Sequence, residues 1–392
     1  MTTFRVGVGN ANASPTSALL LHILQDISGR IATICFAHRV GTALEPECKT
    51  YRLAADVFND IAMILDCLSP GVPAGPMRVI VLSTAGVLRA LCGVAGGSSK
   101  ASLSAHFARW GNLAELNAKD SSQETVISLF GMLVGSVVIS HITSFSTTWL
   151  VLLTLLALHL SMNYAAVRAV QMTSLNRQRA NIAFSSLLNS DPSLAFNLDR
   201  NPPTTKKQLT ILTPAQVSKH EHIFHQDGAL QWTPFPDTHH PSTKQHLGSA
   251  QIGVSMSTLL HGSASTRTSF KPCLPLQQLT AVFANESYML FLVSKNKKGN
   301  VTWHASILLK RGCPVSAQLK AWAHALLAAR VLGPSVTDSN SSTEVVLGVL
   351  ASTLGDLNSN ARFEGYLSEL RGVGWNVDIA ALETRGGRRV DI

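Results

Sequence analysis

The sequence predicts a mainly α protein in three parts. These are a helical, membrane-associated domain over 1–189, a long disordered insert over 190–285, and a small α+β domain over 286–392. Three observations predict this arrangement. First, the 43 residues from Thr125 to Val167 contain no Asp, Glu, Lys or Arg. Second, the insert is rich in Pro, Ser, Thr, Gln and His, a composition typical of disorder. Third, strand-like runs and an amphipathic helix follow it. The chain has only 14% charged residues and a mean hydropathy of +0.19, which favours extensive burial in protein or lipid.

Apolar residues at helical spacing predict the N-terminal helices at 17–38, 47–68, 77–92 and about 99–110. Pro and Gly residues after the second of these predict where it stops. The glycine-rich stretch 93–98 lies between the third and fourth helices. Because glycine is the usual residue of tight turns, we expect a helix–helix corner there.

A polar loop or short helix over 111–124 leads into the charge-free block, which is long enough for two membrane helices of about 20 residues each. The block divides at residues 143–148. We therefore predict a transmembrane hairpin over 125–167. The alternative is a buried helical hairpin inside a soluble bundle.

The flanks of the second half of this block support a membrane span. Trp149 and Tyr164 lie near its ends, as interfacial aromatic residues do. Arg168, Arg177 and Arg179 follow it. If the helix spans a membrane, these arginines are expected on the cytoplasmic or an equivalent inner side.

The insert holds four residues that could ligate a metal, and they lie close together in the sequence: His220, Glu221, His222 and His225. They lack the i, i+4 helical spacing of a zinc protease and any later cysteine pair. We therefore expect solvated histidines and predict no metal site.

The C-terminal domain begins with two strand-like runs, Tyr288–Ser294 and Val301–Lys310, joined by a polar turn that predicts a β-hairpin. An amphipathic helix is expected over Pro314–Leu332, with proline near its first turn. Helical sequence covers 343–371, and Trp375–Ile379 is expected to return as a strand.

Charge and cysteine content exclude some function classes. The net charge of +9 is spread thinly and forms no basic stripe, so we expect no nucleic-acid partner. The six cysteines form no CxxC pair, and no signal peptide is visible, so reduced thiols in a non-oxidising compartment are expected.

Charged residues on the second helix suggest a polar site. Arg52, Asp56, Asn59 and Asp60 recur at three- and four-residue spacing and so share one helix face. They could bind a cation or polar ligand, or form a structural salt-bridge network with Arg89, Arg109 or Lys119. We expect Asp56, Asn59 and Asp60 to converge with Lys119 and Glu124, because buried unpaired charges are costly. The complete candidate polar site is Arg52, Asp56, Asn59, Asp60, His106, Lys119, Asp120, Gln123 and Glu124.

A second candidate site is a phosphate-binding one at the glycine corner, formed by Gly96, Gly97, Ser98 and Lys100. The spacing is not that of a P-loop, and a tight helix corner is the alternative explanation. No catalytic triad, carboxylate pair or cofactor fingerprint can be assembled, so no catalytic residue is predicted.

Several short sequence words occur in the order typical of one family. They are Gly7–Ala11, Lys49, Arg52–Asp56, Asn59–Asp60, Arg89–Ala90, Gly93–Gly97, His106–Ala108, Ala118–Asp120, Ser122–Thr125, Asn163–Tyr164 and Ala166–Val167. Through them the chain resembles the root UV-B sensitive protein family over residues 4–180, with a weaker similarity over 286–392. Another helical segment usually precedes the Gly7–Ala11 word in that family, and the 190–285 insert is longer than usual.

The resemblance implies a membrane-associated helical protein, and it supplies no catalytic residue. Plant members are linked to UV-B responses in roots, vitamin B6 balance and auxin distribution, and paralogues pair. We therefore expect an adaptor or transport-accessory factor at a membrane, in a plastid or another organelle. A paralogous partner or a homo-oligomer would fit this role. The alternative function is binding of a small phosphorylated metabolite such as pyridoxal phosphate, with Lys100 and Lys119 as contacts. Otherwise no cofactor is expected.

Overall fold

The computed structural model describes residues 15–73, 75–142, 144–194, 209–233, 244–261, 276–297, 300–333 and 343–391. The chain divides into two compact units, Met1–Val170 (unit 1) and Gln171–Ile392 (unit 2). This division differs from the expected domain limits at 189/190 and 285/286, because the segment after Val170 packs into the core of unit 2.

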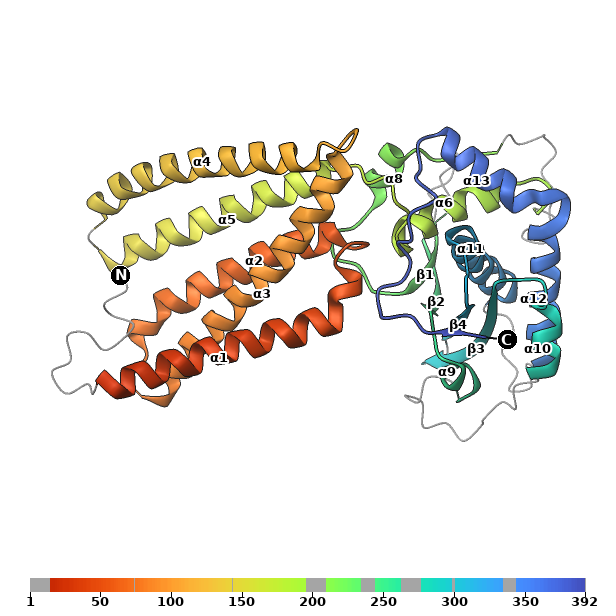
Figure 1. Ribbon diagram of the computed structural model, residues 1–392, viewed down its shortest axis with the longest axis horizontal. Helices are drawn as coiled ribbons and strands as arrows, with labels where there is room; N and C mark the ends of the chain where they lie inside the picture. The colour runs from red at the N-terminus through yellow and green to blue at the C-terminus, as the bar shows by residue number, and fades with distance from the viewer. Residues whose placement is uncertain are drawn as a thin grey trace. The chain divides into compact units, whose positions relative to one another are not determined.

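Unit 1 is all-helical (Figure 1). Its helices are α1 (Pro15–Val40), α2 (Cys48–Leu68), α3 (Pro76–Phe107), α4 (Leu113–His141) and α5 (Phe145–Ala169), with short 3-10 turns at Gly41–Ala43 and Ser69–Gly71. α3 packs against both α1 and α2, and α2 also contacts α5. The helix at 17–38 and the one at 47–68 are thus confirmed.

The expected corner at residues 93–98 is wrong, because α3 runs without a break through the glycines. Each interior glycine costs about 1 kcal/mol relative to alanine, and packing offsets that cost. A Cβ atom on Gly96 would lie 3.6 Å from the Cβ of Ala55, so small residues let α2 and α3 approach closely. Likewise, residues 113–124 are the first turns of α4 rather than a separate loop.

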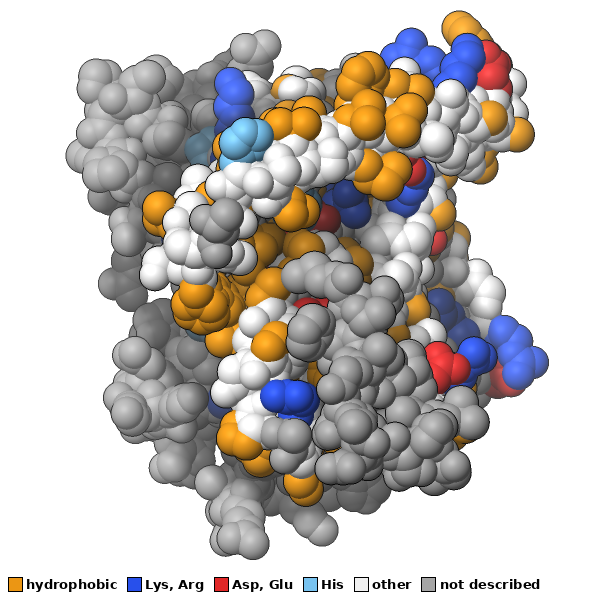
Figure 2. Space-filling model, turned by 90° about the vertical axis from the view of Figure 1, so that its left-hand side faces the viewer, with side chains coloured by type: hydrophobic (Ala, Val, Ile, Leu, Met, Phe, Trp, Pro, Cys, Tyr) orange, Lys and Arg blue, Asp and Glu red, His pale blue; other side chains and the backbone are white. Residues whose placement is uncertain are grey.

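Three helices of unit 1 are long and apolar enough to cross a membrane: α3, α4 and α5. The predicted hairpin over 125–167 corresponds to the later part of α4 and most of α5, and α3 is an additional candidate. No described residue of α4 is buried, although its second half contains no Asp, Glu, Lys or Arg. Figure 2 shows hydrophobic side chains lying open over the helices that face the viewer.

Unit 2 is an α+β fold around a five-stranded sheet. The strand order is β1-β2-β4-β3, and β5 pairs with β4. The strands are β1 (Ala229–Trp232), β2 (Gln245–Ile252), β3 (Tyr288–Lys297), β4 (Asn300–Lys310) and β5 (Arg389–Val390). β3 and β4 form the predicted antiparallel hairpin, whereas β2 and β5 run parallel to β4.

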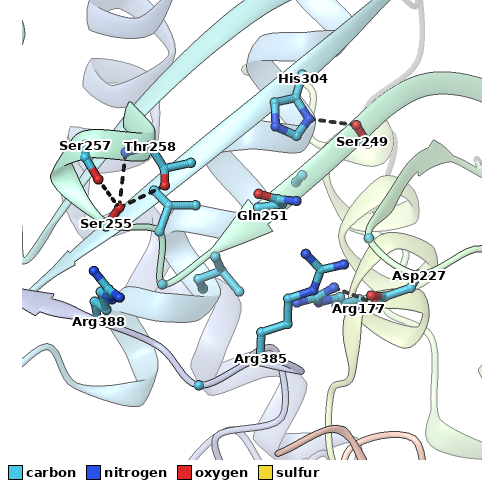
Figure 3. A pocket seen from close by; sticks show the side chains of 16 residues that line it. Arg177, Asp227, Ser249, Gln251, Ser255, Ser257, Thr258, His304, Arg385 and Arg388 are labelled. Carbon is cyan, nitrogen blue, oxygen red and sulfur yellow. Dashed lines mark hydrogen bonds and ion pairs between the residues drawn. The ribbon is translucent and has the colours of Figure 1, made fainter. Parts of the chain in front are cut away.

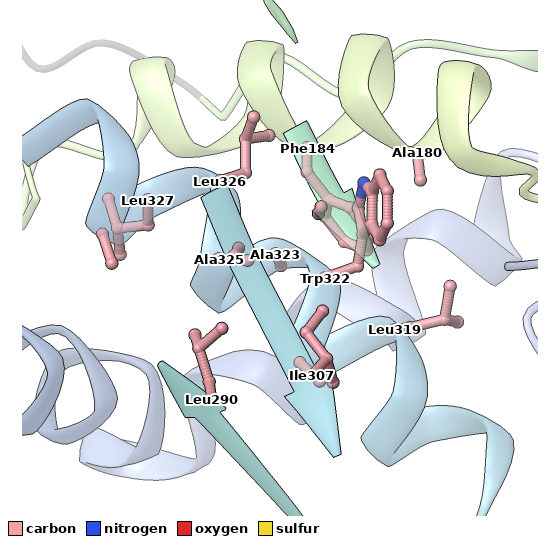
Figure 4. Close-up of a cluster of buried hydrophobic side chains, with 14 of the residues drawn as sticks. Ala180, Phe184, Leu290, Ile307, Leu319, Trp322, Ala323, Ala325, Leu326 and Leu327 are labelled. Carbon is pink, nitrogen blue, oxygen red and sulfur yellow. The ribbon is translucent and has the colours of Figure 1, made fainter. Parts of the chain in front are cut away.

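Helices surround this sheet. They are α6 (Arg177–Ser190), α8 (Pro214–His220), α9 (Met256–His261), α10 (Leu276–Val282), α11 (Val315–Leu332), α12 (Thr343–Asn358) and α13 (Arg362–Gly372), with a 3-10 turn at Ser359–Ala361. The amphipathic helix predicted near 314–332 is confirmed as α11. It contacts the sheet as well as α6 and α12. Its Trp322 is fully buried near Phe184 of α6 and donates a hydrogen bond from Nε1 to Asn181, at 2.9 Å (Figure 4).

Much of the expected disordered insert is folded. Within 190–285 the structure places α8, β1, β2, α9 and α10. Leu230, Trp232 and Ile252 from this region are buried in the core of unit 2, because these short strands carry apolar residues that the polar composition obscured. Residues 195–208, 234–243 and 262–275 of the insert lie outside the described residues.

Two other expectations were wrong. Trp375–Ile379 forms only an isolated bridge, between Asn376 and Ser174, because Trp375 turns into the core. Arg177 and Arg179 do not flank α5 as free surface charges, since both are buried in unit 2. Arg179 Nε donates to Glu221 at 2.9 Å, in a buried ion pair.

The fully buried His324 makes the stability of unit 2 sensitive to acid. Its Nδ1 lies 3.0 Å from the Tyr288 hydroxyl, and its Nε2 lies 2.9 Å from Thr353 Oγ1. Burial lowers the pKa of His324 from 6.5 to about 3, so the unfolded chain takes up more protons between these values. This contribution to stability is fully present above pH 6.5 and is lost as the pH falls towards 3.

We therefore expect the free energy of unfolding to fall below pH 6.5, by up to about 1.4 kcal/mol per pH unit from this residue. Urea unfolding followed by tryptophan fluorescence at several pH values measures it. His324→Gln should flatten the slope, whereas His246→Gln, at an exposed position on β2, should leave it unchanged. An identical slope in wild type and His324→Gln would contradict the assignment.

Candidate functional site

The charged face of α2 is the most polar feature inside unit 1. Asp56 and Asp60 are buried, whereas Arg52 and Asn59 are half-buried. The spacing of these residues places them along one face, as predicted. Arg52 Nη1 lies 3.6 Å from Asp56 Oδ1, and the other carboxylate oxygen of Asp56 is buried without a hydrogen-bond partner among the described residues.

Asp60 is paired with His159, in the middle of the apolar helix α5. The His159 Nδ1 atom lies 3.0 Å from Asp60 Oδ1 and 3.2 Å from Oδ2. This contact joins residues 99 positions apart in the chain. A histidine within an otherwise apolar, membrane-length helix was the sequence signal for such a partner, because polar groups in these helices usually face other polar groups.

Asp66 near the end of α2 pairs with Arg89 of α3. Arg89 had been named as a structural partner for the acids of α2, but it reaches Asp66 rather than Asp56 or Asp60. Charged residues of α2 therefore contact both α3 and α5, and these two pairs tie three helices together.

The polar residues between α3 and α4 form a separate cluster. Lys100 Nζ lies 2.8 Å from Asp120 and 2.6 Å from Glu124. Lys119 is exposed and pairs with Glu115 on its own helix at 2.5 Å. The hydrogen bond that Lys119 donates lowers the pKa of Glu115, because it stabilises the charged carboxylate.

The expected convergence of Asp56, Asn59 and Asp60 with Lys119 and Glu124 is therefore wrong. An intrahelical partner four residues away was available to Lys119, and Glu124 is taken by Lys100. Within the described part of unit 1, no hydrogen bond or ion pair joins the α2 face to α4. Of the other candidates, His106 contacts the ring of Phe107, and Gln123 is exposed.

The four candidate phosphate-binding residues, Gly96, Gly97, Ser98 and Lys100, all lie inside α3. Their backbone N–H groups belong to a continuous helix, so the loop that would have presented them to a phosphate is absent. Phosphate binding at these residues stays a prediction that depends on the Lys100 side chain alone.

A double-mutant cycle on Asp60→Asn and His159→Leu tests the interhelical pair. We expect a coupling energy of about 0.5–3 kcal/mol between the two changes, because each variant removes the same contact. Unfolding in detergent by a graded denaturant provides the measurement. The control cycle combines Asp60→Asn with Lys119→Met, which should be additive within about 0.5 kcal/mol, since these residues do not meet. Additivity in both cycles would reject the Asp60–His159 contact.

Comparison with known proteins places these features in a family. Residues 3–191 match the family model described as "Vitamin B6 photo-protection and homoeostasis domain". "RUS family member 1" of Dictyostelium discoideum is 39% identical over 221 residues, which is 55% of this chain and 38% of that protein. "Protein root UVB sensitive 3" of Arabidopsis thaliana is 29% identical over 339 residues, 85% of this chain and 66% of that protein.

A third relative, "Protein root UVB sensitive 2, chloroplastic" of Arabidopsis thaliana, is 26% identical over 198 residues, 48% of this chain and 43% of that protein. The chain thus covers less than two thirds of the length of each of these relatives. No solved structure matches the chain. The family model covers all five helices of unit 1 and their polar contacts. Residues 3–191 thus match the family domain, and these relatives are root UV-B sensitive proteins.

Proposed function

We propose that this chain is a membrane-associated adaptor or transport-accessory factor rather than an enzyme, with unit 1 in the membrane and unit 2 in an aqueous compartment. The observation that carries the proposal is α4. Its apolar half exposes Ile127, Met132 and Ile139 by 67–72% each. Exposed apolar surface of this length is costly in water, and a lipid environment would remove that cost.

The polar contacts of unit 1 suit such a role. Asp60 and His159 form a pair between helices, which lowers the cost of placing either in an apolar surrounding. Pairs of this kind hold helices in a fixed register, as expected of a scaffold that presents a surface to a partner. Members of the family would be natural partners, either a paralogue or a second copy.

The proposed location is the membrane of a plastid or another organelle. One relative carries "chloroplastic" in its name, which supports a plastid for that protein and suggests a plastid or another internal membrane for this one.

Pyridoxal phosphate bound at Lys100 or Lys119 is the alternative function, supported by the reference to vitamin B6 in the family description. A Schiff base needs an uncharged amine. Lys100 Nζ donates to the carboxylates of Asp120 and Glu124, which favours its charged form, and Lys119 is held in the same way by Glu115. Either lysine would have to give up its ion pairs first, so the contacts favour the adaptor role. Absence of an aldimine absorbance band in purified protein would agree with this preference.

Extraction of membranes with alkaline carbonate tests the membrane assignment. The chain should stay in the pellet, because integral helices are not released when peripheral contacts are broken. Recovery in the supernatant would contradict the proposal.

A charge placed on α4 gives a sharper test. Val134→Lys puts a cation in the centre of the apolar half, where insertion into lipid should cost about 2.5–3.5 kcal/mol. We expect a smaller carbonate-resistant fraction. Ala118→Lys, at an exposed position on the polar half of the same helix, is the matched control and should insert normally. If α4 lies in water, the two variants should behave alike.

A further inference from the structure

A cavity of about 480 Å³ in unit 2 is lined mainly by polar residues. This size is in the range of small-molecule sites. Its walls come from the end of β2 and the segment that follows it, from α6, from β4, and from the C-terminal segment 385–388 (Figure 3).

Three arginines line this cavity: Arg177, Arg385 and Arg388. Arg177 is buried, donates from Nε to the Leu382 carbonyl at 2.7 Å, and is paired with Asp227 at 2.6 Å. Arg385 and Arg388 are exposed and make no ion pair with any residue that the structure describes. Asp227 is the one acidic residue among the described lining residues. The three arginines outnumber it, so the cavity carries a net positive charge.

The C-terminal segment is held in place by its backbone. Arg388 N–H donates to the Gly253 carbonyl at 3.1 Å, and β5 pairs with β4 directly after it. Gly253 has a φ of +76°, and a Cβ atom there would lie 2.9 Å from the Cα of Gly387. The absence of a side chain at Gly253 therefore lets this arginine-bearing segment approach the end of β2.

His304 supplies an unused polar atom in the same lining. It is 5% exposed, and its Nδ1 lies 2.8 Å from the Ser249 hydroxyl. Its Nε2 is buried and has no hydrogen-bond partner within the described ranges. Burial lowers the pKa of His304 to about 4, so the ring is neutral at pH 7. When the Ser249 hydroxyl donates to Nδ1, Nε2 carries the proton and is a donor without an acceptor.

These groups together suit an anion with several oxygen atoms. Guanidinium groups bind phosphate through paired hydrogen bonds, and the hydroxyls of Ser255 and Thr258 lie in the same lining. No lysine occurs among the lining residues, so the cavity offers no amine for a Schiff base.

We propose that this cavity is a binding site for a phosphate monoester, held through its phosphate by Arg385 and Arg388. Arg177 completes the positive wall of the cavity. The site is in unit 2, largely beyond the residues matched by the family model, and it does not depend on the membrane role proposed for unit 1. The ester could be a soluble metabolite or the headgroup of a phospholipid.

Calorimetric titration of the detergent-purified full chain tests the site with two monoester probes. Pyridoxal 5′-phosphate represents a soluble ester, and dihexanoyl phosphatidic acid represents a lipid headgroup. Pyridoxal and dihexanoyl phosphatidylcholine are the matched compounds without a monoester. We expect saturable binding of at least one monoester, and the one that binds more tightly identifies the source.

The double variant Arg385→Gln with Arg388→Gln should weaken that binding at least about tenfold, because two charge-assisted contacts are lost. Both side chains are exposed, and an unchanged thermal unfolding curve verifies the fold. Arg371→Gln, which removes an exposed arginine outside the cavity, should bind within about twofold of wild type. Equal binding by the double variant, or no saturable binding of either monoester, would overturn the proposal.

Discussion

The arrangement of unit 1 depends on the charged face of α2. A helix that carries Arg52, Asp56 and Asp60 cannot be buried among apolar helices unless its charges meet partners. The structure meets this constraint with Arg52 on the same helix and with His159 on α5. Asp66 and Arg89 add a link to α3. The charged face thus fixes which sides of α3 and α5 face α2. The remaining apolar surface of α4 and α5 is exposed.

Local patterns were sufficient to predict most helices and the β3–β4 hairpin, because helical spacing and strand alternation are properties of neighbouring residues. The contacts between polar side chains were harder to predict. The polar face of α2 was predicted, but its contact with His159 joins residues 99 positions apart, and no local pattern encodes that distance. Lys119 was assigned to the wrong partner for a different reason, because a distant contact was preferred over a local one. The nearby Glu115, four residues earlier on the helix, was the better choice on helix geometry alone.

The polar composition of residues 190–285 led to a wrong prediction of disorder where short strands and helices lie within polar sequence. The strand β1 has only four residues, yet Leu230 and Trp232 on it are fully buried. A four-residue strand changes the average composition of a 96-residue segment very little. The glycines of α3 misled in a different way. They were interpreted as a turn, whereas Gly96 serves close packing against Ala55 within a continuous helix. Glycine predicts close backbone approach, and only the tertiary partner decides between a turn and a helix contact.

Arg177 shows how one residue type supports two opposite interpretations. Next to an apolar block it is expected to be a flanking charge on a membrane surface. Here it is buried, and it joins the C-terminal segment to Asp227 through the Leu382 carbonyl. Thr384 donates to the same carboxylate at 3.4 Å. Because both contacts need residues after 380, the cavity can form only when the C-terminal segment is docked. Its positive wall is therefore a product of the folded unit and could not be recognised from the local sequence around any one of its arginines.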